Sequence, residues 1–120
     1  MALYIAYYFR TESGKAPVKE FVDLLDNRTQ RKFFYMLALL EDFGHKLPLP
    51  HAKYIGDEIF ELRFSGVEGS IRFFYFFFHQ HRVIFTNGFI KKSNKLPHNE
   101  KLIAANRRRE FFEAEKRKKA

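Results

Sequence analysis

Residues 58–97 read EIFELRFSGVEGSIRFFYFFFHQHRVIFTNGFIKKSNKLP, three runs rich in aromatic and β-branched residues followed by a lysine-rich loop. Residues 58–64 alternate apolar and polar side chains, so one face of this strand should meet a core. Residues 70–78 are aromatic enough to be buried on both faces, as in a central strand. Residues 82–87 form the third run. Short polar or Gly-containing turns separate the runs, and the stretch therefore predicts an antiparallel three-stranded meander.

Two arginines of this stretch are predicted to face one another. If the first hairpin is symmetric about Val67 and Glu68, Arg63 pairs directly with Arg72. Opposed cations repel unless an anion lies between them. Two interpretations follow: either the pair binds a phosphate, or Glu61 or another acidic residue neutralises it.

The N-terminal half predicts one strand and two helices. Residues 3–9 are β-branched and aromatic, which favours a strand. Pro17 suits the first turn of a helix, and Asn27 with Gln30 predicts the capping box of a second one that ends at Gly44. We expect the second helix to bury several apolar side chains, namely Phe33, Phe34, Leu37, Leu40 and Phe43. The two helices should form a hairpin over the sheet.

The remaining segments connect and close the fold. Prolines at positions 48 and 50 exclude a helix interior, so residues 45–55 are expected to be an extended connection. Pro97 opens a last helix whose shared apolar face should hold Leu102, Ala105 and Phe112. The same helix should carry a cationic band of Arg107, Arg108 and Arg109. Residues 113–120 are expected to be a frayed basic tail. The fold class is α+β, with residues 1–120 as one domain.

Composition narrows the possible chemistry. The 120 residues include no cysteine, which excludes disulfides, thiolate zinc sites and cysteine nucleophiles. We expect a chain that stays in the cytoplasm, because no leader-like or membrane-spanning apolar segment is evident. The net charge of +8 is uneven: residues 1–88 hold 11 basic against 10 acidic residues, and residues 89–120 hold 11 against 4. This asymmetry favours a polyanionic partner, with nucleic acid first, although a solvated basic tail would have the same composition.

The order of these features resembles the RelE/ParE superfamily of toxins from type II toxin-antitoxin systems. Three groups of residues carry the resemblance: Glu61-Leu62-Arg63, then Arg72 with Tyr75, then the segment 88–97 with its lysines. The pattern is similar to that of the phage-derived HigB-type branch. It covers residues 61–113 well and the first half of the chain in outline.

The resemblance implies a ribosome-dependent endoribonuclease that cuts messenger RNA during translation and is held inactive by a cognate antitoxin. It implies that no metal or organic cofactor is required, and it suggests a helix-turn-helix DNA-binding antitoxin. Arg and Lys would supply donors for the charge that grows on phosphorus. The candidate catalytic residues are Arg63, Arg72, Lys92, Lys95 and His98, and the candidate RNA-binding residues are Lys91, Tyr75, Arg107 and Arg108.

Some of these residues have simpler interpretations. Tyr75 alternates away from Arg72, which favours a core tyrosine over a contact with RNA. His79 and His81 could ligate a metal, but no third ligand is evident and a turn explains both residues better. Two other functions stay open: a non-enzymatic ParE-like inhibitor of DNA gyrase, and a plain nucleic-acid-binding module. The arginine pair and the lysine loop favour the nuclease.

Overall fold

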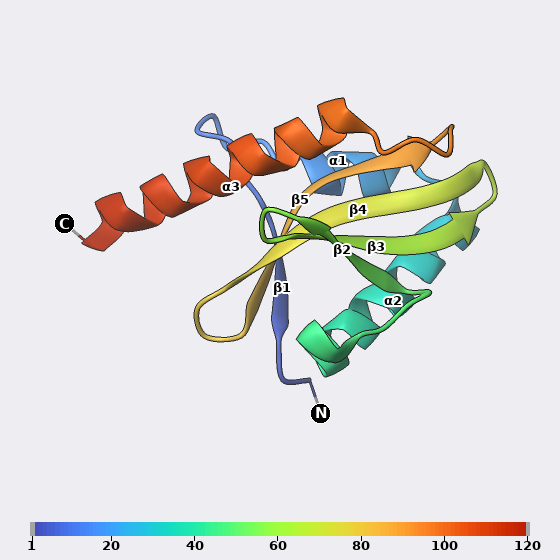
Figure 1. Cartoon of the computed structure of the whole chain (residues 1–120), viewed down its shortest axis with the longest axis horizontal. Coiled ribbons are helices and arrows are strands. Elements are labelled where there is room, and N and C mark those ends of the chain that lie inside the picture. The colour runs from blue at the N-terminus through green and yellow to red at the C-terminus, as the bar shows by residue number, and fades with distance from the viewer. Residues whose placement is uncertain (1, 120) are drawn as a thin grey trace.

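The structure, a computed structural model, describes residues 2–119 and has an α+β fold with a five-stranded mixed sheet and three α-helices (Figure 1). In chain order the elements are β1 (Ile5–Tyr8), α1 (Pro17–Leu24), α2 (Asn27–Phe43), the 3-10 turn η1 (Gly44–Lys46), β2 (Ala52–Gly56), β3 (Ile59–Gly66), β4 (Gly69–Phe78), β5 (Arg82–Lys91) and α3 (His98–Lys119). The strand order is β1-β5-β4-β3-β2, with β1 parallel to β5 and the other pairs antiparallel.

The sheet separates two apolar cores. Helices α1 and α2 cover one face, where Phe33, Phe73 and Phe85 form the centre of the larger core. Helix α3 crosses the other face and closes a smaller core around Phe74 and Phe76 (Figure 1). Because β4 contributes to both cores, its side chains are buried on both faces, as its aromatic sequence predicts.

The predicted meander is confirmed as β3, β4 and β5, and its first hairpin is symmetric about Val67 and Glu68, with Gly66 opposite Gly69. The third strand is longer than predicted and runs on to Lys91. The sheet also has an edge strand, β2, which begins within the segment 45–55 that was expected to be only a connection and ends at Gly56. That prediction was wrong because the helix-breaking effect of the two prolines ends at position 50, and five residues are enough for an edge strand.

The predicted helix pair is present, but its details differ. Pro17 begins α1 and Gly44 caps the end of α2, as expected. The N-cap of α2 is Asp26 and not Asn27, because the Asp26 carboxylate accepts a hydrogen bond from the Thr29 amide at 3.0 Å. Phe34 and Phe43 are about half exposed, whereas Met36 is buried in their place. The prediction is confirmed for Phe33 and Leu40, which are buried, and wrong for Phe34 and Phe43, which lie at the edges of the apolar face.

Helix α3 meets the sheet through a face that includes the predicted Phe112 but not the predicted Leu102. Ala104 is fully buried and Phe111 and Phe112 pack on the smaller core, while Leu102 is 61% exposed. Helical geometry continues through Lys119, and the fraying expected for residues 113–119 stays a prediction. Residue 120 of that predicted tail lies outside the described residues. Within residues 2–119, no helix is both long and apolar enough to cross a membrane.

Candidate functional site

The central feature of the site is an arginine pair on neighbouring strands. Arg63 on β3 lies directly opposite Arg72 on β4, in the register that the sequence predicts. The carboxylate of Glu61 lies between them, with Oε1 3.3 Å from Nε of Arg63 and Oε2 3.6 Å from Nε of Arg72. We call these three residues the arginine cluster. It belongs to the sheet face that α3 partly covers, because Phe74 and Phe89, the neighbours of Glu61 and Arg72 on the adjacent strands, pack in the smaller core.

Burial makes the cluster electrostatically sensitive. Arg72 is 9% exposed and Glu61 is 4% exposed, while the side chain of Arg63 remains 29% exposed and opens the cluster to solvent. Burial lowers the pKa of Arg72, the Arg63 charge lowers it further, and the Glu61 carboxylate opposes both effects. The Arg72 guanidinium therefore stays charged but lies in surroundings that favour a nearby anion.

The donors of the cluster are incompletely used. Arg72 donates from one terminal nitrogen to the Ile71 carbonyl at 3.1 Å. Neither Nε, of Arg63 or of Arg72, has a hydrogen-bond partner within the described residues. One carboxylate offsets one of the two guanidinium charges, so the cluster keeps one surplus positive charge. Both Nε atoms are buried against the Glu61 carboxylate, so a phosphate oxygen would meet the surplus charge through the exposed part of the Arg63 side chain.

The lysine-rich connection begins next to the cluster. Lys91 pairs with Ser70, two positions along the sheet from the pair formed by Phe89 and Arg72, so Lys91 lies on the same face as the cluster. Lys92 and Lys95 follow on an exposed connection, and His98, also exposed, is the first residue of α3. Among the residues described, no hydrogen bond or ion pair joins these three side chains to the arginine cluster.

Two contacts at the start of α3 determine where this connection returns to the sheet. Asn87 on β5 donates its side-chain amide to the Glu100 carboxylate at 2.9 Å and to the Glu100 carbonyl at 3.2 Å. Lys101 lies 3.3 Å from the carboxylate of Asp57. The exposed segment 92–97 is therefore held at both ends, at the end of β5 and at the first turn of α3, beside the arginine cluster.

Three of the residues predicted to bind RNA are held by contacts within the protein. Tyr75 is 1% exposed on the opposite face of β4, stacked near Phe60, and burial raises its pKa, which keeps the phenol protonated. Arg107 donates to the Thr86 carbonyl at 2.8 Å, and burial lowers its pKa. Arg108 lies over the ring of Phe112 at 4.6 Å. All three side chains are used in packing, and the core interpretation of Tyr75 accounts for its position.

The missed strand β2 and the residue before it, His51, bring two further residues to the cluster. Lys53 lies directly opposite Glu61, and the His51 carbonyl accepts a hydrogen bond from the Arg63 amide at 2.8 Å. Lys53 thus adds an exposed cation beside the carboxylate. The sequence signal that could have found it is the alternation in residues 52–55, which is short and lies close to Pro50.

The histidines of the β4–β5 turn are exposed and contact aromatic rings. His79 lies against Phe78, with ring centroids 4.5 Å apart, and His81 meets the edge of Tyr4 at 5.1 Å. The part of the chain that the structure describes has no group of three His, Cys, Asp or Glu residues that could hold a metal ion.

Comparison with known proteins gives the class to which this fold and site belong. Residues 20–109 match the family described as phage derived protein Gp49-like (DUF891). The match covers most of the chain, and the protein belongs to this phage-derived family, which is of the RelE/HigB-like toxin type and commonly related to toxin-antitoxin systems. The matched region contains the arginine cluster and the lysine-rich connection. No curated protein matches the chain.

Proposed function

We propose that this protein is the toxin of a type II toxin-antitoxin system of the RelE/ParE superfamily and that it cleaves messenger RNA on the translating ribosome in the cytoplasm. A cognate antitoxin, a helix-turn-helix DNA-binding protein, would hold it inactive. The observation that carries the proposal is the arginine cluster, in which two opposed guanidinium groups share one carboxylate. Membership of a toxin-type family supports the same conclusion.

The proposed reaction is an attack of a ribose 2′-hydroxyl on the adjacent phosphorus. The bond from the 2′ oxygen to phosphorus forms, the bond to the 5′ oxygen breaks, and a 2′,3′-cyclic phosphate and a 5′-hydroxyl result. One proton leaves the 2′ oxygen and one reaches the departing 5′ oxygen. Arg63 and Arg72 would stabilise the charge that develops on the phosphate oxygens, and Lys92, Lys95 or His98 would transfer the protons.

Dependence on the ribosome follows from the arrangement of these groups. The described residues place cations at the cluster, but the candidate proton-transfer groups lie on an exposed segment without a fixed contact to the arginines. Positioning must then supply much of the rate. The ribosome would hold the messenger strand and the 92–97 connection in one productive geometry, and naked RNA should survive.

The direct test compares the wild-type protein with Arg72→Met in a reconstituted translation system. Toeprinting should show cuts within translated codons for the wild-type protein only, and expression of wild-type protein without an antitoxin should arrest growth. Efficient cutting of the same RNA without ribosomes would contradict the proposed mechanism. Inhibition of DNA gyrase supercoiling by both proteins, without RNA cleavage, would support the gyrase alternative instead.

A further inference from the structure

Helix α3 carries two kinds of basic residue, which the sequence does not distinguish. Arg107 and Arg108 are held against the sheet by the Thr86 carbonyl and the Phe76 ring, and Arg108 also lies over the ring of Phe112 on α3 itself. Their positive charges contribute to docking of the helix. The basic residues near the C-terminal end, in contrast, lie where α3 extends past the sheet (Figure 1).

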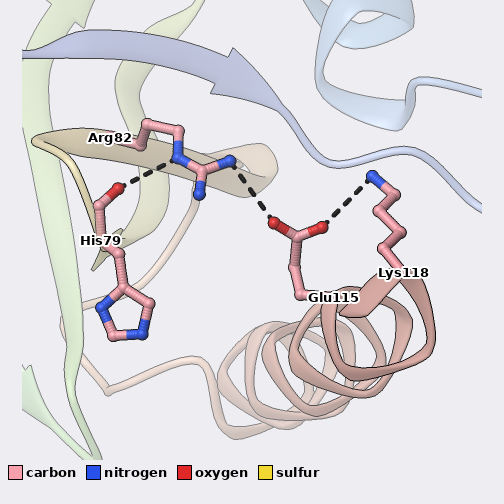
Figure 2. Close-up of polar contacts among 4 residues, drawn as sticks. All are labelled: His79, Arg82, Glu115 and Lys118. Carbon is pink, nitrogen blue, oxygen red and sulfur yellow. Dashed lines mark hydrogen bonds and ion pairs between the residues drawn. The ribbon is translucent and has the colours of Figure 1, made fainter. Parts of the chain in front are cut away.

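An ion-pair brace marks the last point at which α3 is tied to the sheet. Arg82, at the start of β5, donates to Glu115 at 3.4 Å and also to the His79 carbonyl at 3.0 Å (Figure 2). Lys118 contacts the second oxygen of the same carboxylate at 3.2 Å. The two basic groups lower the pKa of Glu115, first through the Lys118 hydrogen bond, so the brace is charged at neutral pH.

The last turn of α3, which includes Lys118 of the brace, is cationic in every direction. Successive residues of a helix are rotated by about 100°, so four consecutive basic residues surround its axis. Lys116, Arg117, Lys118 and Lys119 are all exposed. Of these, Lys116, Arg117 and Lys119 form no ion pair within residues 2–119. We call these three residues the terminal cations.

We propose that the terminal cations bind the phosphate backbone of structured RNA. Cations that approach phosphates position a protein without reading bases, which fits a helix end with no apolar residue in its last turn. A protein partner would need an apolar centre to its interface, and residues 116–119 offer none. The chemistry of this surface therefore favours RNA over an acidic protein.

The distance along α3 indicates a folded RNA. A helix of 22 residues is about 33 Å long, and its first turn lies beside the arginine cluster. The terminal cations thus lie at the opposite end of the long axis from the β3–β4 turn (Figure 1). A few nucleotides at a cleavage point would not reach both ends of α3, whereas a folded RNA presents phosphates across such a span. If the proposed function holds, ribosomal RNA is the expected partner, and this identification of the partner rests on the proposed function.

The test is the salt dependence of binding to a 20-base-pair RNA duplex, measured by fluorescence anisotropy. The variant Lys116→Gln/Arg117→Gln/Lys119→Gln removes three charges from the end of α3. The matched control Arg28→Gln/Arg31→Gln/Lys32→Gln removes three charges from exposed positions of α2. Each lost phosphate contact should reduce the slope of log K against log salt by about 0.9. We expect a reduction of about 2 to 3 for the α3 variant and a clearly smaller change for the α2 control.

Equal slopes for the two variants would overturn the proposal, because the charges would then act only through net charge. Unchanged RNA binding with lost binding to polyglutamate would also overturn it and indicate an acidic protein partner. The test is separable from the nuclease proposal, since duplex binding requires neither cleavage nor ribosomes. The salt slope is measured on an RNA duplex without ribosomes and cleavage is measured in a translation system, so a failed nuclease and a failed RNA-binding arm give different results. Far-ultraviolet circular dichroism of each variant checks that α3 is still helical.

Discussion

Arg63 and Arg72 lie directly opposite one another on β3 and β4, with the Glu61 carboxylate within ion-pair distance of both. The two interpretations of the sequence are therefore not exclusive: Glu61 neutralises part of the charge, and a surplus positive charge remains for a substrate phosphate. Like charges at opposed positions are destabilising in a sheet, and the carboxylate offsets that cost. Glu61 therefore stabilises the fold and also orients the guanidinium groups of Arg63 and Arg72, the two candidate catalytic residues.

The first prediction concerns Arg72→Met, which keeps an apolar stem in the buried position but removes the guanidinium. We expect cleavage to fall by about two to three orders of magnitude, or roughly 3 to 4 kcal/mol of transition-state stabilisation. The melting temperature should change little, because Glu61 keeps Arg63 as a partner and the repulsion between the two arginines is removed. A variant that unfolds much more easily yet cleaves normally per folded molecule would contradict the assignment.

The second prediction concerns the lysines of the exposed connection. Lys92→Gln and Lys95→Gln should each weaken ribosome-dependent cleavage and leave thermal unfolding unchanged, because both side chains are exposed. Lys32→Gln, an exposed change on α2, is the matched control and should have neither effect. Full activity of the double variant Lys92→Gln/Lys95→Gln would exclude the connection from the site.

The third prediction concerns the contact by which Arg107 docks α3 on the sheet. Arg107→Gln should leave the Thr86 carbonyl, inside the protein, with a poorer donor and reduce the free energy of unfolding by about 1 to 2 kcal/mol. Hydrogen exchange should rise along α3. The neighbouring change Arg109→Gln should cost little stability, since Arg109 is exposed and, within residues 2–119, its side chain donates a hydrogen bond only to Asn106. Equal stability of the two variants would show that the Thr86 contact is not important for docking.

Much of the sheet could be predicted from the sequence because its signals are local. Alternation in β3 and the glycines around Val67 and Glu68 determine the hairpin register, and the register alone places Arg63 opposite Arg72. The partition of basic residues in α3 could not be predicted, because it depends on which side of the helix faces the sheet. That orientation is set by Ala104, Phe111 and Phe112, and of these three the sequence pattern indicates only Phe112.

The strand β2 shows a second limit. Its pairing with β3 depends on a long-range contact, and a five-residue segment after two prolines has too weak a period to be assigned locally. Because β2 was not predicted, Lys53, which lies opposite Glu61, was not identified as a residue near the candidate site. The candidate site was thus predictable where it lies on one hairpin and was not where a distant edge strand completes it.

The fourth prediction is a pH dependence of stability at the start of α2. The Thr29 hydroxyl, and then the Thr29 amide, donate hydrogen bonds to Asp26 and lower its pKa. Because the pKa of Asp26 is lower in the folded than in the unfolded state, the ionised carboxylate stabilises the protein at a pH above the unfolded-state pKa. This stabilisation is lost below about pH 4, as the pH falls through the folded-state pKa. Asp26→Asn can still cap the helix but does not titrate there. Urea unfolding between pH 5 and 2.5 should therefore show a smaller loss of stability for Asp26→Asn than for the wild-type protein.

The fifth prediction concerns the carboxylate between the two arginines. Glu61→Gln keeps the side-chain shape but leaves Arg63 and Arg72 facing one another without an anion. Removing one partner of a buried ion pair usually costs about 3 to 5 kcal/mol. We expect the free energy of unfolding to fall by less, about 2 to 3 kcal/mol, because Arg63 is partly exposed to water.

Inorganic phosphate should partly reverse this loss. An anion that binds only the folded state stabilises it in proportion to the logarithm of its concentration, and the variant offers a vacant place between two cations. Phosphate at ~50 mM should therefore raise the melting temperature of Glu61→Gln more than that of the wild-type protein, with chloride at equal ionic strength as the control. The double variant Glu61→Gln/Arg72→Met, which lacks the opposed pair, should lose this extra response. An equal phosphate response in all three proteins would mean that the arginine cluster does not bind phosphate.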